Sequence, residues 1–215
     1  RYWAYAGRGE GVEAGRTSVA DYTALMAASQ QAVAREILAL CDFSSAIRVL
    51  DIGGSNGTFI AATAGRYPAL RFTLFDLPAV SEIAKETFEK HKISDRVTIV
   101  PGSFLTDALP EGADVATLIR VLHDHDDDSA LTILRAARRA LSGGGRLILA
   151  EPLSGLPDTA PIADAYFGLY FAAMGQGKTR TAQEITRLGL AAGFSRISAP
   201  KSRMPLITSV MILEQ

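Results

Sequence analysis

Apolar and polar positions alternate along this chain in blocks that predict strands and helices in turn. Short runs of consecutive apolar residues are typical of strands that are buried on both faces of a parallel sheet. Such runs occur at residues 47–51, 71–75, 97–100, 115–122 and 146–151. Between them, apolar residues recur at helical spacing over residues 58–66, 78–91 and 127–141. This alternation predicts a Rossmann-like α/β fold, a mostly parallel sheet with helices on both faces.

The two ends of the chain differ from this repeating pattern. Residues 17–40 carry apolar positions at helical spacing, with Ser18 and Asp21 resembling a capping box. After Glu151 we expect helices at residues 161–174 and 181–192, and then strands at residues 194–199 and 206–213. Two consecutive strands with no helix between them imply an antiparallel hairpin, whose turn contains Pro205. A seven-stranded, mostly parallel sheet that ends in such a hairpin is the pattern of class I methyltransferases.

Composition narrows the setting and excludes some partners. The net charge of -1 offers no electrostatic basis for binding nucleic acid. Cys41 is the only cysteine, which excludes an internal disulfide and fits a reducing compartment. No apolar run approaches the roughly 20 residues that span a bilayer, and no signal-peptide pattern opens the sequence. We therefore expect a soluble cytoplasmic protein without an integral membrane segment.

The length of 215 residues suits one large domain, and a hydrophobic content of 48% is enough for a sizeable core. We expect residues 41–215 to form a catalytic domain, with residues 1–40 as a linker and a helix that packs on it. The chain starts with Arg1, and the glycine-rich residues 1–16 do not resemble the start of a domain. We expect a piece of a longer chain, with an ordinary terminal segment as the alternative.

A glycine-rich turn follows the first predicted strand and leads into a helix. It reads Asp51-Ile52-Gly53-Gly54-Ser55-Asn56-Gly57. Such a turn lies where the crevice at the sheet edge meets a helix N-terminus, and its glycines let the backbone approach a ligand closely. Asp51 can accept a hydrogen bond from an ammonium group or a bound water. Asp76 ends the next strand, where an acidic residue can bind both hydroxyls of an adenosine ribose.

Two kinds of cofactor are candidates for binding at this turn. A dinucleotide site requires the pattern G-x-G-x-x-G, whereas the glycines of this chain fall at positions 53, 54 and 57. A carboxylate just before the glycines would repel a pyrophosphate but suit the positively charged amino acid end of S-adenosylmethionine. The residues therefore favour this methyl donor, and a tight turn without a ligand is the remaining alternative. Residues 175–179 resemble the end of a phosphate-binding loop, but position 172 is Ala where that motif requires Gly.

A cluster of histidines and aspartates at residues 123–128 follows a buried strand and precedes a helix. Because strand carboxyl ends face the ligand crevice in open α/β sheets, His123 can reach a substrate there and act as a general base. A metal site and a structural role are the alternatives. For residues 126–128 we favour capping of the following helix, and for His125 a solvated loop position. We do not expect a metal.

Five short motifs, taken in order, resemble the plant-type and bacterial O-methyltransferase family, which uses S-adenosylmethionine. They read DIGGSNG, FDLP, PGSF, RVLHD and AEP, and they begin at Asp51, Phe75, Pro101, Arg120 and Ala150. The similarity runs from about Tyr22 to the C-terminus. Within the family, residues 22–30, 120–127 and 173–181 resemble the carotenoid branch, the hydroxyneurosporene (demethylspheroidene) O-methyltransferases.

The resemblance implies a role for each matching position. In the catalytic set, His123 would be the general base, Glu151 would orient it, and Asp124 would lie near the cofactor. Asp76 would hold the ribose of S-adenosylmethionine. The full cofactor set comprises Asp51, Gly53, Gly54, Gly57, Asp76, Leu77, Ser103, Phe104 and Arg120, with Ser103 and Phe104 beside the adenine. The substrate set comprises Met26, Phe167, Tyr170 and Met174, for each of which an ordinary core position is the alternative.

Two positions depart from the family pattern, since His125 replaces an aromatic residue and Ser55 replaces a glycine. Members also carry an N-terminal winged-helix domain that forms the homodimer and closes the substrate pocket, and we expect it to be missing from this sequence. The expected reaction is methyl transfer to a hydroxyl of a small apolar molecule, with a hydroxycarotenoid as the favoured acceptor and S-adenosylhomocysteine as the product. A phenolic or polyketide acceptor, an NAD-dependent oxidoreductase and a non-catalytic binding module are the alternatives.

Overall fold

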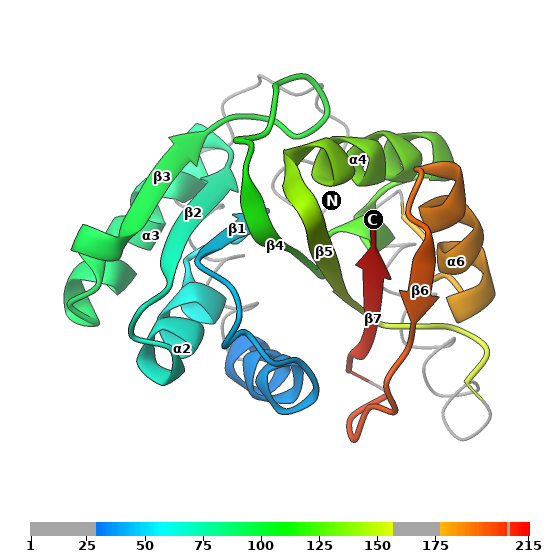
Figure 1. The fold of residues 1–215 in the computed structure, drawn as a ribbon, viewed down its shortest axis with the longest axis horizontal. Helices are drawn as coiled ribbons and strands as arrows, with labels where there is room; N and C mark the ends of the chain where they lie inside the picture. The colour runs from blue at the N-terminus through cyan, green and yellow to red at the C-terminus, as the bar shows by residue number, and fades with distance from the viewer. Residues whose placement is uncertain (1–28, 157–176, 206) are drawn as a thin grey trace.

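Seven strands form one sheet in the computed structural model, which describes residues 29–156, 177–205 and 207–215. The strands lie in the order β3-β2-β1-β4-β5-β7-β6 (Figure 1). The parallel strands are β1 (Arg48–Ile52), β2 (Arg71–Asp76), β3 (Val97–Pro101), β4 (Ala113–Ile119) and β5 (Leu141–Glu151). The strand order reverses between β1 and β4, which is where sheets of this kind bind their ligands.

A hairpin closes the sheet at one edge. β7 (Ser209–Glu214) pairs antiparallel with β5, and β6 (Arg196–Ser198) pairs antiparallel with β7. Pro205 lies in the connection between the two strands of the hairpin. The predicted seven-stranded, mostly parallel sheet with an antiparallel end is therefore confirmed.

Helices cover both faces of this sheet. One face carries the helical segment 29–40, α2 (Thr58–Arg66) and α3 (Pro78–Lys90), and the other carries α4 (Asp127–Ala140) and α6 (Ala182–Ala191). Two buried apolar clusters fill the space between the layers. Successive residues of β1 enter opposite clusters. Val49 belongs to the cluster under α2 and α3, and Leu50 to the cluster under α4 and α6, as expected for a strand that is buried on both faces.

The start of β5 differs from the sequence prediction. Residues 142–145 were expected to separate helix from strand, but β5 already begins at Leu141, directly after α4. Leu141 pairs with Ala113, and the register of the two strands then shifts, so the glycine-rich residues form an irregularity inside the strand. Gly144, with a φ of 78°, adopts the left-handed backbone that such a bulge uses.

The end of β4 also differs from the prediction. β4 stops at Ile119, and Leu122 lies in the 3-10 helix η2 (Leu122–Asp124). The extended conformation ends because Arg120 has a left-handed φ of 58°. Another 3-10 helix, η1 (Ser94–Arg96), precedes β3. The helix predicted at residues 161–174 and the first part of the one at residues 17–40 lie outside the described residues.

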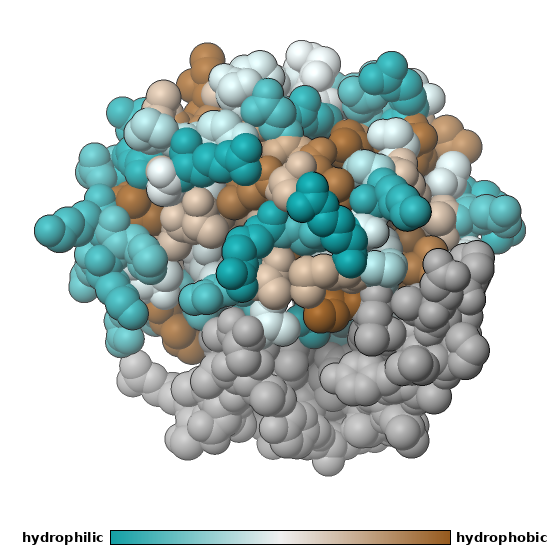
Figure 2. Space-filling view, turned by 90° about the horizontal axis from the view of Figure 1, so that it is seen from below, coloured by the Kyte–Doolittle hydropathy of each residue, from teal (hydrophilic) through white to brown (hydrophobic). Residues whose placement is uncertain are grey.

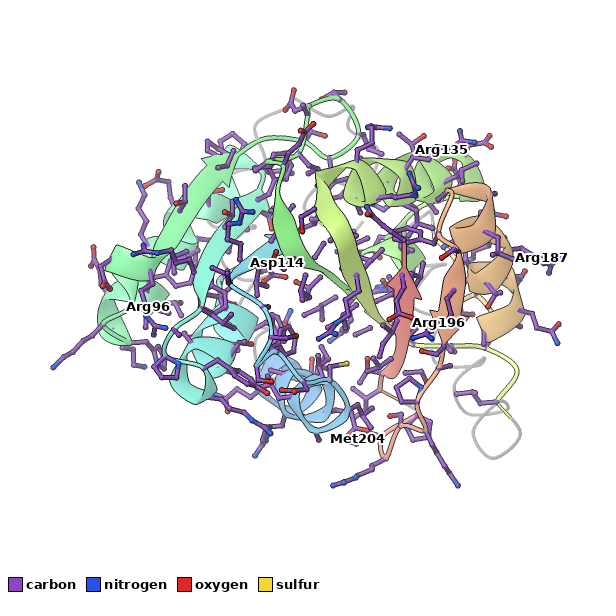
Figure 3. The ribbon with its side chains drawn as sticks, in the orientation of Figure 1. Arg96, Asp114, Arg135, Arg187, Arg196 and Met204 are labelled. Carbon is purple, nitrogen blue, oxygen red and sulfur yellow. The ribbon has the colours of Figure 1, made fainter. Side chains whose placement is uncertain are left out.

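Side chains at the amino ends of the strands tie the sheet to its connections (Figure 3). Asp114 accepts hydrogen bonds from the N–H groups of Ile47 and Arg48, each at 2.8 Å, at the start of β1. Arg96 donates to the Pro68 carbonyl at 2.8 Å, in the connection from α2 to β2. These contacts lie at the amino ends of the strands, whereas the glycine turn of residues 51–57 lies at their carboxyl ends. Asp114 and Arg96 therefore take no part at the edge that carries the turn.

The described surface is mixed in character. Figure 2 shows charged and apolar residues interspersed over the described part of one face. Ile47 and Leu190 are the large apolar side chains that are exposed among the described residues. Of the helices in these ranges, none combines the length and the apolar character needed to cross a membrane.

The packing of α2 on α3 yields a first prediction. Gly57 precedes α2 with a φ of 75°, and a Cβ atom there would lie 2.4 Å from Cε1 of Phe88. We predict that Gly57→Ala lowers the free energy of unfolding by about 2–4 kcal/mol, because it adds backbone strain to a clash in the core. Urea unfolding followed by circular dichroism measures this loss.

Gly65→Ala is the matched control for that substitution. Gly65 lies inside α2, and a Cβ atom there would meet nothing within 4 Å. Alanine favours the helix, so the control should be neutral or stabilising by up to about 1 kcal/mol. Equal losses at the two positions would contradict this account of the turn.

Candidate active site

The ends of four neighbouring strands meet where the sheet order reverses. Residues 51–57 lie at the end of β1, Asp76 ends β2, residues 120–125 follow β4, and Glu151 ends β5. Carboxyl ends of neighbouring parallel strands share one edge of a sheet, so these segments lie side by side. The predicted cofactor and catalytic residues lie on these segments or on the loops after β2 and β3.

The turn after β1 depends on left-handed backbone at Gly53, Ser55 and Gly57, whose φ angles are 70°, 53° and 75°. The Gly53 N–H donates to the Phe75 carbonyl at 2.8 Å, which ties the turn to β2. A Cβ atom on Gly53 would lie 2.8 Å from Cγ2 of Val121. Glycine is therefore required at this position for the turn to pack against the segment that follows β4.

Asp51 is a carboxylate buried under this turn, with 1% of its surface exposed. Its Oδ1 accepts a hydrogen bond from Thr117 Oγ1 at 2.6 Å, whereas Oδ2 is buried without a hydrogen-bond partner among the described residues. A Cβ atom on Gly54 would lie 2.5 Å from Oδ2, so this oxygen lies directly beneath the turn. Burial raises the pKa of Asp51 to about 7. A ligand that brings a cationic donor to the turn would fit this unsatisfied acceptor.

Asp76 holds the same turn from the end of β2. Its Oδ2 accepts a hydrogen bond from the Ser55 N–H at 2.8 Å, and Oδ1 accepts one from the Leu77 N–H at 2.7 Å. Burial raises the pKa of Asp76 to about 6, although both hydrogen bonds lower it. A carboxylate offers about four lone-pair sites, so each oxygen can accept one more hydrogen bond, as a pair of ribose hydroxyls requires.

An aromatic pair borders the turn. The rings of Phe104 and His125 lie 5.4 Å apart, edge to face, and Cε1 of Phe104 would lie 3.7 Å from a Cβ atom on Gly53. The Ser103 N–H donates to Asp107 Oδ2 at 2.8 Å, which fixes the loop that carries Phe104. His125 lies in a loop, as predicted, but its ring is only partly exposed because it packs edge to face against Phe104.

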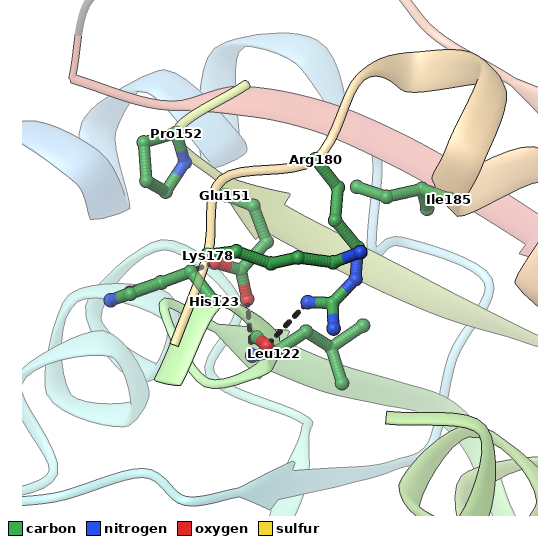
Figure 4. A pocket seen from close by; sticks show the side chains of 7 residues that line it. All are labelled: Leu122, His123, Glu151, Pro152, Lys178, Arg180 and Ile185. Atoms are coloured by element: carbon green, nitrogen blue, oxygen red, sulfur yellow. Dashed lines mark hydrogen bonds and ion pairs between the residues drawn. The ribbon is translucent and has the colours of Figure 1, made fainter. Parts of the chain in front are cut away.

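His123 and Glu151 form a buried pair between the ends of β4 and β5 (Figure 4). His123 Nδ1 lies 2.6 Å from Glu151 Oε2. The other oxygen of Glu151, Oε1, accepts hydrogen bonds from the N–H groups of Val121 and Leu122, at 2.8 and 2.7 Å. A carboxylate that already accepts backbone hydrogen bonds is suited to accept a third from the imidazole, so we assign a proton to Nδ1.

A second carboxylate adjoins the same imidazole. Asp124 Oδ1 lies 3.4 Å from His123 Nε2. Burial lowers the pKa of His123, but the charges of Asp124 and Glu151 outweigh it, so this pKa lies above its ordinary value. Burial in turn raises the pKa of Asp124. His123 is therefore a stronger base than a histidine in water.

Arg120 lies between the strand ends and the helical segment 29–40. Its N–H donates to the Ala150 carbonyl at 2.8 Å, and its Nη1 donates to Ser29 Oγ at 2.7 Å. The structure thus places Arg120 at the edge of the site, and its contact with the cofactor stays a prediction. The predicted substrate residues Met26, Phe167, Tyr170 and Met174 lie outside the described residues.

The aspartates that follow the histidines have separate roles. Asp126 Oδ1 accepts a hydrogen bond from the Ser129 N–H at 2.8 Å and caps α4, as predicted. Asp127 and Asp128 lie in the first turn of α4, where negative charge interacts favourably with the helix dipole and stabilises the helix. Within the described ranges, no group of three or more histidine, cysteine, aspartate or glutamate side chains is arranged to hold a metal ion.

Arg180 lines the site but is not among the residues that the sequence singles out. A small pocket near His123 is lined by Leu122, His123, Glu151, Pro152, Lys178, Arg180 and Ile185 (Figure 4). The Arg180 side chain is buried, and its Nη1 donates to the Leu122 carbonyl at 2.7 Å. The available sequence signal is its position directly before Thr181, which caps α6 in a capping box with Glu184.

The strand order, the hairpin at the sheet edge and the glycine turn at the reversal point define the class I methyltransferase fold. The site lies where that fold binds its ligands. The chain belongs to the O-methyltransferase domain family, which matches residues 5–195. This confirms the family resemblance that the five sequence motifs indicated.

Two curated relatives are similar over most of the chain. The demethylspheroidene O-methyltransferase of Rhodobacter capsulatus is 43% identical over 196 residues, which cover 90% of this chain and 48% of the relative. The protein of the same name from Cereibacter sphaeroides is 39% identical over 211 residues, which cover 98% of this chain and 55% of the relative. The chain therefore spans about half the length of the curated relatives that it matches.

A third relative and a solved structure show how wide the similarity is. The aclacinomycin 10-hydroxylase RdmB of Streptomyces purpurascens is 36% identical over 204 residues, which cover 91% of this chain and 54% of that protein. The structure "PigF with SAH" aligns with a TM-score of 0.84 and 26% identity, over 94% of this chain and 60% of that one. The relatives thus include one that is named for a reaction other than methyl transfer.

The buried carboxylate of Asp51 yields a prediction about pH. Its pKa is about 7 in the folded chain, against 3.8 for an ordinary aspartate. The folded chain keeps a proton that the unfolded chain releases between about pH 4 and 7, so the free energy of unfolding must fall as the pH rises through this window. We predict that Asp51→Asn removes this fall and gains about 2–4 kcal/mol over the wild type by pH 7, measured by urea unfolding.

Asp114→Asn is the control, and the opposite pH dependence is expected from it. Burial raises the pKa of Asp114, but hydrogen bonds from Arg48, Ile47 and Ser142, together with the charge of Arg48, lower it by more. The stabilisation by the Asp114 carboxylate is therefore present at neutral pH and is lost as the pH falls. The deficit of this variant should be largest near pH 7. A common response of both variants to pH would refute the assignment for Asp51.

Proposed function

We propose that this chain is the catalytic part of an O-methyltransferase, which transfers the methyl group of S-adenosylmethionine to a hydroxyl of a small apolar molecule. The observation that carries the proposal is the buried His123–Glu151 pair on the same sheet edge as the glycine turn. The reaction requires an oxygen nucleophile in line with the S–CH3 bond and a base for its proton. The family supports methyl transfer, and the structure of PigF with SAH supports the choice of donor.

The residues of the turn fit the donor at both of its polar ends. S-adenosylmethionine, when bound, supplies a methyl group on a positively charged sulfur. Asp76 would accept the two ribose hydroxyls on the lone pairs that Ser55 and Leu77 leave open. Asp51 would pair with the ammonium end through its unsatisfied Oδ2, under Gly54. The other proposed cofactor residues are Gly53, Gly54, Gly57, Leu77, Ser103, Phe104 and Arg120.

His123 would take the proton from the acceptor hydroxyl. Glu151 engages Nδ1, so Nε2 is the nitrogen that receives this proton. Asp124 and Glu151 would then stabilise the imidazolium, for the same reason that they raise the pKa of His123 against the effect of burial. Asp124 would also lie close to the donor, since it follows His123 in the turn after β4.

A hydroxycarotenoid is the favoured acceptor, because two relatives that cover most of this chain are named for demethylspheroidene. A tertiary alcohol of this kind is far less acidic than a phenol. His123 would therefore accept its proton only as the new C–O bond forms. An apolar crevice would suit the polyene chain, and Met26, Phe167, Tyr170 and Met174 are proposed to face it.

The alternative functions can be distinguished by direct tests. A phenolic or polyketide acceptor keeps the same chemistry, and assays that pair a carotenoid alcohol with a phenol separate the two. RdmB, named for a hydroxylation, raises the question of a changed reaction on this fold. NAD is not expected to bind, because the glycine spacing does not suit a dinucleotide. Titration with NAD and with S-adenosylmethionine distinguishes the two cofactors.

For the whole protein, the resemblance implies a homodimer formed through an N-terminal winged-helix domain, and the composition of the sequence favours a cytoplasmic location. We propose both, together with residues 41–215 as the catalytic domain on which the helix before it packs. Val33 and Ile37 of the helical segment 29–40 are buried in the core beside α2 and α3, which supports the last point. The buried thiol of Cys41 fits a reducing compartment.

Removal of the proposed base gives the sharpest test. We predict that His123→Ala lowers kcat by about 10²–10⁴-fold, because no other residue takes the proton from the acceptor. The Kd for S-adenosylmethionine, measured by calorimetry, should stay within about threefold of the wild type. His91→Ala removes an exposed histidine at the end of α3 and serves as the control, with unchanged turnover. A kcat of His123→Ala close to that of the wild type would refute the assignment of His123 as the base.

Donor binding is tested separately at Asp76. We predict that Asp76→Ala weakens the binding of S-adenosylmethionine and of S-adenosylhomocysteine by about 10–100-fold, because hydrogen bonds to a carboxylate are lost. Asp95→Ala removes an exposed carboxylate in η1 and should leave both Kd values unchanged. Calorimetric titration of both ligands with the wild type and the two variants measures these Kd values. Equal affinity in wild type and Asp76→Ala would contradict the proposed position of the ribose.

A further inference from the structure

Two oppositely charged side chains hold the turn that carries His123. Glu151 accepts hydrogen bonds from the N–H groups of Val121 and Leu122, as described above. Arg180 donates to the carbonyls of the same turn: Nη1 to that of Leu122 and Nη2 to that of His125, each at 2.7 Å. Two donors of the turn are thus satisfied by a buried anion and two of its acceptors by a buried cation.

The backbone next to Arg180 reinforces this contact. The Lys178 N–H donates to the His123 carbonyl at 2.9 Å, so residues 178–180 contact three carbonyls of the turn. The Arg180 carbonyl accepts a hydrogen bond from the Ser154 N–H at 3.1 Å, just beyond the end of β5. Residues 178–180 therefore link the turn that carries His123 to the strand that carries Glu151.

The turn needs this support because it has little of its own. η2 is a single 3-10 turn, and the His125 N–H reaches the Leu122 carbonyl at 3.2 Å. Arg180 itself is 2% exposed, and its ion partner, Asp127, is 54% exposed and contacts Nε at 2.8 Å. Burial of a guanidinium against one half-exposed carboxylate is a weak source of stability, since the cation loses its water. The position of the guanidinium against the turn that carries His123 is therefore more informative than its ion pair with Asp127.

We propose that Arg180 is a positioning residue for the methyl-transfer reaction, which fixes the His123 imidazole against Glu151 by holding the carbonyls of Leu122 and His125. This inference rests on the proposed function, in which His123 takes the acceptor proton. Arg180 acts through the backbone and not on the substrate. Its guanidinium is planar and donates from three nitrogens in fixed directions, a geometry that lysine does not reproduce.

The test compares Arg180→Lys and Arg180→Gln with Arg138→Gln in the same chain. Arg138 Nε also donates to a backbone carbonyl, that of Gly193 at 2.7 Å, but at the other end of α4 and away from His123. The measurements are the pH profile of kcat with a hydroxycarotenoid, the Kd for S-adenosylmethionine, and the NMR titration of His123. The charged groups around His123 are Asp124, Glu151 and Arg120, together with Lys178 and Arg180, which line the same pocket.

Arg180→Lys should fold, keep its Kd within about threefold and lose kcat by about 10–100-fold, because a displacement of about 1 Å is enough for such a loss. The pKa of His123 should fall towards its ordinary value as the imidazole moves away from its carboxylates. Arg180→Gln should lose more kcat than Arg180→Lys, but its His123 titration is less informative because the lost positive charge by itself raises that pKa. Arg138→Gln should change neither kcat nor the titration of His123. An unchanged His123 titration in Arg180→Lys, whether kcat falls or not, overturns the inference. A wild type that transfers no methyl group overturns the proposed function instead, and the titration still decides the role of Arg180.

Discussion

The contact between Glu151 and the turn after β4 holds the candidate site together. A carboxylate at the end of an interior strand must be compensated, because an unpaired buried charge is costly. Glu151 meets this requirement with two backbone N–H groups and the imidazole of His123. The same contacts set the position of His123, because they fix both its ring and the backbone just before it. The need to satisfy one buried charge thus determines where the proposed base lies.

The donor side of the site is organised by the same kind of constraint. Asp51 and Asp76 end neighbouring strands, and burial raises the pKa of both. Each oxygen of Asp76 accepts one backbone hydrogen bond, from Ser55 or from Leu77, whereas one oxygen of Asp51 has no partner among the described residues. Asp76 thus helps to build the turn and keeps a lone pair on each oxygen for a ligand, whereas Asp51 leaves one whole oxygen for it. The two carboxylates can therefore act on different ends of one molecule.

Local patterns predicted most of the fold and the residues at the strand ends. Continuous apolar runs predicted β1 to β5. The glycines, aspartates and His123 that follow these strands predicted which edge of the sheet binds the ligand. Local patterns did not reveal the bulge at residues 142–145, because pairing with β4 carries that strand through its glycines. They also did not mark Arg180 as a site residue, since its partners are mainly backbone carbonyls and carbonyls have no sequence signature. The environment of His125 likewise depends on Phe104, a distant residue in the chain.

The hydrogen bond between Ser55 and Asp76 has one more consequence. Ser55 adopts a left-handed backbone that a serine rarely uses, and its amide is anchored by the carboxylate proposed to receive the sugar. Occupancy of that carboxylate is therefore coupled to the rate at which the Ser55 amide exchanges its hydrogen with solvent. The exchange rate of this one amide, which takes no part in the reaction, therefore indicates whether the crevice is occupied.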